Sequence, residues 1–160
     1  MTFVVDGMLG KLAKWLRVLG FDVVYLPRAE DHQLLRLAQK EGRAVLTRDT
    51  DLAAKAGGLG SLLIRSQRWE DQVRQVLDEF RLRGEIKPYS RCITCNARLV
   101  PLAREDARNL VPPFVFERSQ EFSICSSCSR VYWPGTHLRG MASRLESVLW
   151  SNAEEGEKNS

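Results

Sequence analysis

The sequence predicts an α/β protein in which a parallel sheet flanked by helices is followed by a small, cysteine-bearing domain. In the first half of the chain, short apolar runs alternate with segments of helical periodicity, which is typical of βαβ units and a parallel sheet. In the second half, all four cysteines lie in two C-x-x-C pairs. We therefore expect a core domain over residues 1–86, a second domain with a C-terminal helix over residues 87–150, and a disordered tail over residues 151–160.

The predicted elements of the core alternate along the chain. The strands are apolar runs bounded by turn residues, at 2–5, 21–26, 44–47 and 61–64. The helices are segments with apolar residues at helical spacing. They are expected over residues 8–19 and 30–41, in a segment that opens with residues 48–51, and from residue 69 to about residue 83. Gly20 and Gly42 follow the first two helices in the position of C-caps. In the second domain, we expect strands within residues 111–124 and a helix over residues 137–150.

The positive charge of the chain is concentrated in the second domain. The net charge of the 160 residues is +4, with +2 over residues 1–86 and +4 over residues 87–150. Eighteen of the 24 basic residues are arginine, whose planar guanidinium group binds phosphate and stacks on bases. This composition points to nucleic acid as a partner, with an ordinary solvated basic surface as the alternative.

Several classes of protein are disfavoured by what the sequence lacks. No apolar run approaches the roughly 18–20 residues that span a bilayer. The N-terminal segment, MTFVVDGMLGKL, has no basic stretch ahead of its apolar residues, so we expect neither a signal peptide nor a membrane protein but a cytoplasmic one. The segment VVDGMLG matches neither the dinucleotide fingerprint nor the Walker motif, which argues against a nucleotide cofactor.

The four cysteines have the spacing of a metal site, in the pairs Cys92-x-x-Cys95 and Cys125-x-x-Cys128. Two such knuckles supply the four thiolates of a tetrahedral structural zinc, which would hold the fold together rather than catalyse. The 29 residues between the pairs exceed the about 15–20 of the commonest pattern, so this insert needs structure of its own. Disulfides and a four-thiolate iron centre are the alternatives, although nothing indicates the oxidising compartment that disulfides require.

Acidic residues follow the predicted strands, at the edge where the function of a parallel sheet is expected. Asp6 ends the first strand, Asp49 and Asp51 follow the third, and Asp31 begins the second helix. Converging carboxylates repel one another unless a divalent cation neutralises them, and oxygen-only ligands suit Mg²⁺ or Mn²⁺. One or two such ions would activate a water and stabilise charge on a phosphodiester. The alternative is that each aspartate caps the helix that follows it.

Three basic side chains lie near these acids in the sequence. Lys11 and Lys14 are three residues apart on the first helix, and Arg48 is adjacent to Asp49. They are candidates to guide a phosphate backbone toward the carboxylates, although single exposed cations are more often solvated surface.

The motifs of both halves match one known pattern in the same order. They are the run DGMLGKLAKWLRVLGFD from Asp6 to Asp22, the tetrapeptide Leu46-Thr47-Arg48-Asp49, the two cysteine pairs with Asn96, and the run YWPGTH from Tyr132 to His137. Over residues 3–141, they resemble the Mut-seven C-terminal RNase domain, a PIN-like nuclease family with a zinc ribbon.

This resemblance implies a PIN-like α/β core fused to a zinc ribbon and acting on RNA, with ribosomal or transfer RNA as candidates. It implies Zn²⁺ as the structural metal and Mg²⁺ or Mn²⁺ as the catalytic metal. The expected ligands of the catalytic metal are Asp6, Asp31 and Asp49, with Asp51 as a further catalytic acid.

In the ribbon, the resemblance makes Arg98, Arg130 and His137 candidates for RNA binding, beside Lys11, Lys14 and Arg48. His137 is expected either to contact phosphate or to cap the last helix. Trp133 is expected either to stack on RNA or, preferably, to pack beside the zinc.

Two functions follow from the sequence. The first is a metal-dependent ribonuclease that hydrolyses RNA phosphodiesters at the acidic site, with the zinc ribbon aiding RNA binding. The alternative is a non-catalytic RNA- or ribosome-binding protein on the same fold. Both leave open which RNA is bound, endonucleolytic or exonucleolytic attack, the number of catalytic metals and the oligomeric state.

Overall fold

The computed structural model describes residues 1–150, without the side chains of residues 136–139, and divides the chain into two compact units. The first unit runs from Met1 to Leu99 and the second begins at Val100. The first unit extends past residue 86 because the following segment is hydrogen-bonded to the end of the first helix. The backbone N–H groups of Lys87 and Tyr89 donate to the carbonyls of Leu19 and Val18, each at 2.9 Å.

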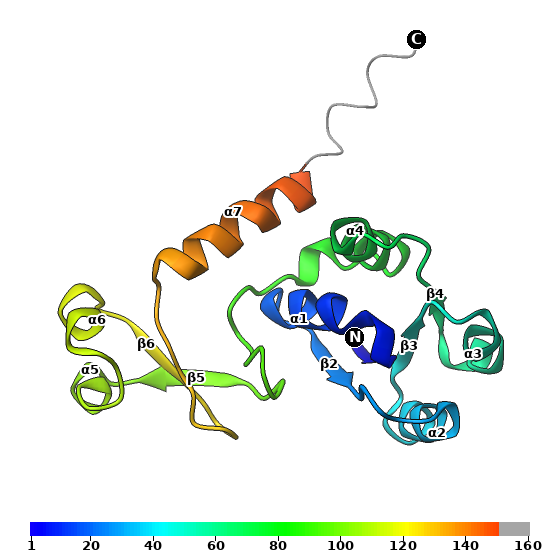
Figure 1. Ribbon diagram of the computed structural model, residues 1–160, viewed down its shortest axis with the longest axis horizontal. Helices are drawn as coiled ribbons and strands as arrows, with labels where there is room; N and C mark the ends of the chain where they lie inside the picture. The colour runs from blue at the N-terminus through cyan, green and yellow to red at the C-terminus, as the bar shows by residue number, and fades with distance from the viewer. Residues whose placement is uncertain (151–160) are drawn as a thin grey trace, which may run out of the picture. The chain divides into compact units, whose positions relative to one another are not determined.

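The first unit is a parallel sheet with helices on both faces (Figure 1). Its strands lie in the order β2-β1-β3-β4 and are β1 (Thr2–Val5), β2 (Asp22–Tyr25), β3 (Ala44–Thr47) and β4 (Leu62–Leu63). Its helices are α1 (Gly10–Val18), α2 (Asp31–Glu41), α3 (Thr50–Lys55) and α4 (Trp69–Glu79). The predicted parallel sheet flanked by helices is confirmed.

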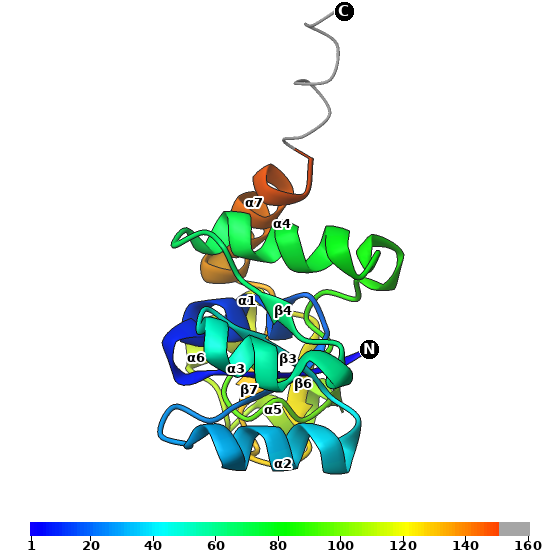
Figure 2. The ribbon, with the colours of Figure 1, turned by 90° about the vertical axis from the view of Figure 1, so that its right-hand side faces the viewer.

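Alternating side chains of the strands supply two apolar layers. On one face, Val4 and Val45 pack in a buried cluster with Leu34 of α2 and Leu52 of α3. Phe3 makes edge-on contacts with the rings of Phe21 and Phe80, with ring centroids 6.3 and 5.4 Å apart. Helices α1 and α4 meet through Trp15 and Trp69, whose rings stack at 4.3 Å. Figure 2 shows α4 and α2 on opposite sides of the strands.

The order of the strands reverses between β1 and β3. The chain passes from β1 through α1 to β2 on one side, and then through α2 to β3 on the other side of β1. In parallel sheets, such a reversal leaves a crevice outside the carboxyl ends of the two strands. The residues that follow Val5 and Thr47 therefore occupy the position where a ligand is expected.

The second unit contains a small three-stranded sheet in the order β5-β6-β7, with β6 and β7 antiparallel. Its elements are β5 (Leu99–Leu102), α5 (Arg104–Ala107), α6 (Pro113–Arg118), β6 (Phe122–Cys125), β7 (Val131–Tyr132) and α7 (Thr136–Trp150). Its core is formed by Ala107, Val111, Val115 and Phe122, and Trp133 packs against them. Trp133 is thus partly buried against this apolar core, and its place beside the zinc stays a prediction. No helix in the described part of the chain is both long and apolar enough to cross a membrane.

The prediction of strands within residues 111–124 is confirmed only for the last part of this segment. Residues 113–118 form helix α6, and only residues 122–125 form a strand. The reason lies in the pair Pro112-Pro113, which places a proline in the first turn of the helix. There the missing N–H group costs no hydrogen bond, and the fixed φ of proline favours the helical conformation.

Candidate functional site

Asp6 lies at the end of β1 and is held by the backbone on both sides. Its N–H group donates to the carbonyl of Leu46 at 3.1 Å, which continues the pairing of β1 with β3. Its Oδ1 accepts from the N–H of Met8 at 2.7 Å, as an N-cap does. The residue is only 7% exposed. One carboxylate is therefore held at the carboxyl ends of the two central strands.

Thr47 connects Asp6 to Asp49. The Thr47 hydroxyl donates to Oδ2 of Asp6 at 2.5 Å and accepts from the N–H of Asp49 at 2.9 Å. Asp49 in turn is the N-cap of α3, and its Oδ1 accepts from the N–H groups of Asp51 and Leu52 at 2.8 and 3.1 Å. The acidic residues that follow the two central strands are thus connected through one buried hydroxyl.

Two glycines allow the end of β2 to pack closely against the turn after Asp6. A Cβ atom on Gly7 would lie 2.6 Å from the carbonyl oxygen of Pro27, and one on Gly10 would lie 2.8 Å from the hydroxyl of Tyr25. Real Cβ atoms do not approach so closely. The Tyr25 hydroxyl also donates to the carbonyl of Gly7 at 2.8 Å. The glycines of the DGMLG run therefore serve close packing beside the acid.

The four predicted acids have different surroundings. No lysine, arginine or histidine within the described residues forms an ion pair with Asp6 or Asp49, whereas Asp31 pairs with Lys55 of α3 at 3.6 Å. Asp51 is exposed, as is Asp49. In the described part of the chain, the four aspartates do not form a group of three or more close enough to share one ion. The capping role that the sequence offered as the alternative is present at both Asp6 and Asp49.

The predicted basic residues are also placed differently. Lys11 and Lys14 are exposed on α1, and Arg130 is exposed after the second cysteine pair. Arg48 is half-buried, and its Nε has no hydrogen-bond partner among the described residues. A buried donor without a partner is costly, which makes Arg48 a candidate to bind an added anionic group. His137 lies in α7, and its side chain is outside the described residues.

The four cysteines form one cluster. The Sγ atoms of Cys92, Cys95, Cys125 and Cys128 all lie within 4.8 Å of one another, and no disulfide joins them. Four thiolates around a tetrahedral zinc with bonds of about 2.3 Å would be about 3.8 Å apart, so the cluster fits this ion. The N–H groups of Ser127 and Cys128 point to Sγ of Cys125 at 3.4 Å, which favours its thiolate form. The disulfide alternative is not realised.

Arg17 fastens the first cysteine pair to α1, an interaction that motif reasoning missed. Its guanidinium group donates to the carbonyls of Ile93 and Thr94, at 3.1 and 3.2 Å, and to the carbonyl of Val23 at 3.0 Å. Burial lowers the pKa of Arg17, and the charges of Cys92 and Cys95 act against this effect. The one signal in the sequence is an arginine among the apolar residues of the first helix.

A comparison with protein families decides the relationship that these motifs suggest. The model of a family described as the Mut7-C RNase domain matches residues 1–145. The chain belongs to this family. The Mut7-C chain is also similar to a human protein named "Exonuclease mut-7 homolog", with 36% identity over 99 residues. That match covers 58% of this chain and 11% of the relative, so the chain spans about a tenth of the relative's length. No solved structure matches.

Membership of the Mut7-C family places the chain in a family described as an RNase domain. The family match and the fold agree, because the matched residues include the parallel sheet, the acidic edge and the four-cysteine cluster.

Proposed function

We propose that this Mut7-C chain is a metal-dependent ribonuclease that hydrolyses RNA phosphodiester bonds at the acidic edge of its sheet. The observation that supports this most is the connection of Asp6 and Asp49 through the Thr47 hydroxyl, at the edge of the sheet where the strand order reverses. Beyond the two helix caps, this hydroxyl links the aspartates that follow two neighbouring strands.

The carboxylate of Asp6 offers oxygen ligands of the kind that Mg²⁺ or Mn²⁺ prefers. Each Oδ atom of Asp6 accepts one hydrogen bond, which leaves a lone pair on both oxygens for a further ligand. A carboxylate that is 7% exposed and lacks a cationic partner among the described residues is a favourable place for a hard cation. When bound, the ion supplies a Lewis acid that neutralises charge on the phosphate.

The residues of the chain itself would orient the ligands and the substrate. Thr47 fixes the rotation of the Asp6 carboxylate, and the first turn of α3 fixes Asp49. Asp31 and Asp51 are the third and fourth candidates, and each would have to move toward Asp6 and Asp49 to share their ion, with Asp31 giving up Lys55. Lys11, Lys14 and Arg48 would attract the phosphate backbone toward this edge.

We assign the zinc ribbon a supporting role. The cysteine cluster would hold Zn²⁺ without an open ligand position, so the zinc stabilises the fold rather than reacting. Arg98, Arg130 and His137 are proposed to bind RNA there, and ribosomal and transfer RNA are the first substrates to examine.

The test is cleavage of labelled single-stranded and structured RNAs by zinc-loaded protein with Mg²⁺, Mn²⁺ or no added divalent cation. We expect cleavage only with an added cation, and a loss of at least about 100-fold in the variant D6N/D49N, since carboxylate ligands are replaced by neutral amides. The matched control is Asp106→Asn, because Asp106 is exposed and forms no ion pair with a described residue.

Binding of the same RNAs separates the two functions considered. A ribonuclease requires that D6N/D49N bind RNA like the wild type but not cut it. Equal binding with no cleavage by the wild-type protein under any condition would contradict the proposal and favour the RNA-binding alternative.

A further inference from the structure

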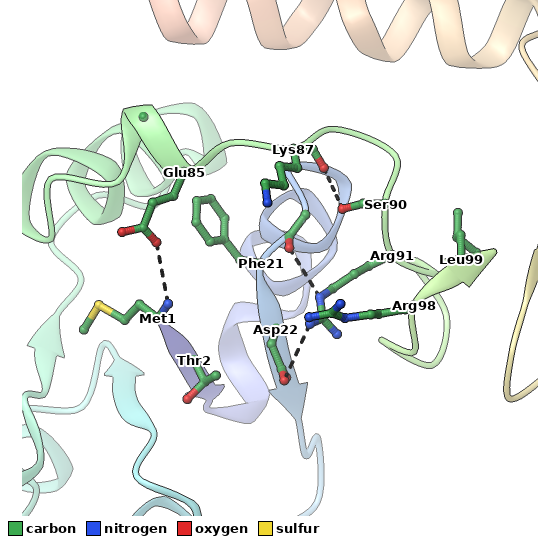
Figure 3. A pocket seen from close by; sticks show the side chains of 12 residues that line it. Met1, Thr2, Phe21, Asp22, Glu85, Lys87, Ser90, Arg91, Arg98 and Leu99 are labelled. Carbon is green, nitrogen blue, oxygen red and sulfur yellow. Dashed lines mark hydrogen bonds and ion pairs between the residues drawn. The ribbon is translucent and has the colours of Figure 1, made fainter. Parts of the chain in front are cut away.

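A polar pocket of about 710 Å³ lies at the edge of the sheet opposite the acids (Figure 3). Thr2 and Asp22, the first residues of β1 and β2, line this pocket. Asp6 lies at the other end of β1, directly after its last residue. Because the strands are parallel, their amino ends share one edge and their carboxyl ends the other. At about 3.3 Å per residue, Thr2 and Asp6 are roughly 13 Å apart along the strand. The pocket is therefore separate from the acidic site.

Three cationic side chains line the pocket: Lys87, Arg91 and Arg98. Arg91 and Arg98 are partners in an antiparallel bridge, which presents their side chains on the same side of the backbone, and Figure 3 shows both extending toward Asp22. Lys87 is exposed and forms no ion pair with any described residue.

The two carboxylates of the pocket, Asp22 and Glu85, are outnumbered by these cations. Asp22 forms its shorter ion pair, at 2.7 Å, with Arg43, a residue outside the pocket lining. Its ion pair with Arg91, inside the lining, is longer, at 3.8 Å. Glu85 is the second carboxylate of the lining, against three cations. A local excess of positive charge therefore faces the pocket, and such an excess attracts anions.

The backbone around these cations is held rigidly. Gly20 has a φ of +94°, and a Cβ atom there would lie 2.2 Å from the carbonyl oxygen of Lys87, so only glycine lets the two segments meet. Arg91 donates to the carbonyls of Gly20 and Asn96 at 3.3 and 2.9 Å. The hydroxyl of Ser90 donates to the carbonyl of Lys87 at 2.7 Å. A positively charged site that is ordered in advance binds phosphate at a lower entropic cost.

We propose that this pocket binds backbone phosphates of an RNA strand away from the position of cleavage. The proposal rests on the proposed function, because it assigns a second binding region to the same substrate. Guanidinium and ammonium groups bind phosphate oxygens of any sequence, so the pocket adds affinity without selecting bases. RNA long enough to reach both edges of the sheet then binds more tightly than a fragment that fills the acidic site alone.

The test measures RNA binding directly, by fluorescence anisotropy of labelled single strands of increasing length, without added Mg²⁺ or Mn²⁺. The variants are Lys87→Gln and Arg98→Gln, and the controls are Arg36→Gln and Lys40→Gln on the exposed surface of α2. Lys87→Gln is the cleaner variant because the exposed ammonium group of Lys87 forms no ion pair with a described residue. Zinc content and thermal unfolding show whether Arg98→Gln is folded.

For long RNAs, we expect each pocket variant to bind about tenfold more weakly than the wild type, as removal of one charge-assisted hydrogen bond predicts. The slope of log Kd against log salt should fall by about 0.7 for each phosphate that is no longer neutralised, while the control variants keep the wild-type slope. For the shortest RNAs, the pocket variants should bind like the wild type.

Two results would overturn the proposal. In the first, the pocket variants bind long RNA with the affinity and salt slope of the controls. In the second, millimolar inorganic phosphate or AMP displaces the strand in a Lys87-dependent manner at every RNA length, which would make the pocket a site for small phosphates. Neither readout depends on cleavage, so a chain that fails to cut RNA would still give a decisive answer here.

Discussion

The hydroxyl and the carbonyl of Thr47 together make three hydrogen bonds at the centre of the acidic edge. Its hydroxyl donates to Asp6 and accepts from the N–H of Asp49, and its carbonyl accepts from the N–H of Ile64 at 2.7 Å. The residue is fully buried, so neither of the side-chain bonds can be replaced by water without rearrangement. One hydroxyl therefore sets the orientation of both acidic positions.

Replacing Thr47 by valine keeps the shape of the side chain but removes one hydrogen-bond partner from the buried Asp6 carboxylate and from the N–H group of Asp49. We expect Thr47→Val to lower the free energy of unfolding by about 1–3 kcal/mol and to reduce metal-dependent cleavage. Thr47→Ser is the matched control, because it keeps the hydroxyl and should retain most of the activity. Denaturant unfolding and RNA cleavage measure the two effects. A valine variant as stable and active as the serine variant would show that the hydroxyl is dispensable.

Some residues of the candidate site could be predicted from the sequence and others could not. Asp6 and Asp49 follow short apolar runs, so their place at strand ends is visible without a structure. Thr47 is ambiguous, since threonine is also common inside strands. Arg17 and Asn96 act on segments far away in the chain, with Arg17 bonded to Thr94 across 77 residues. Such partners depend on tertiary packing, which no local pattern contains.

At the scale of secondary-structure elements, hydrophobic periodicity predicted the strands and helices that bury an apolar face. The strands at 2–5 and 44–47 have the expected bounds, since both are buried on both sides. The helix predicted from 69 to about 83 ends at Glu79 instead. Arg81 there has a φ of +54°, a left-handed conformation that usually calls for glycine. With an arginine in that place, the sequence gives no signal for the end of the helix.

The free edge of β2 is covered by the segment that carries the first cysteine pair. The side-chain oxygen of Asn96 accepts from the N–H of Val23 at 2.9 Å, and its amide donates to Asp22 at 2.8 Å. Burial raises the pKa of Asp22, but the hydrogen bonds from Arg43 and Asn96 outweigh burial and hold this pKa below its ordinary value. The charge of Asp22 thus contributes to joining β2 with two other segments.

The lowered pKa of Asp22 predicts that the stability of the fold depends on pH. Because the pKa of Asp22 is lower in the folded state, its charge stabilises the fold above the ordinary carboxyl pKa of about 3.9. That contribution is lost as the pH falls below about 4 toward the lowered value. We expect the wild type to be more stable than Asp22→Asn at pH 7, and this difference to shrink at pH 3. Denaturant unfolding at both values measures it, with Asp106→Asn as the control. A difference independent of pH would exclude a contribution from the charge.

At the scale of the whole molecule, the two units draw on different sources of stability. The first unit has apolar layers on both faces of a four-stranded sheet. The second has a short sheet and a small apolar cluster of Ala107, Val111, Val115 and Phe122, and a domain of this size is often only marginally stable unaided. Zinc bound by the cysteine cluster would supply what the small core lacks, since binding of the ion to four thiolates would add directly to the free energy of folding.

Removal of zinc should therefore act unequally on the two units. We expect about one zinc per chain by elemental analysis, and its loss in Cys125→Ser. In hydrogen exchange, that variant and chelator-treated protein should lose protection in β6 and β7 but keep it in β1 and β3. Ser127→Ala is the matched control, because it changes the same knuckle without removing a thiolate or the N–H group that faces Cys125. Full protection of β6 and β7 in zinc-free protein would mean that the apolar core alone suffices, and that the four cysteines have another use.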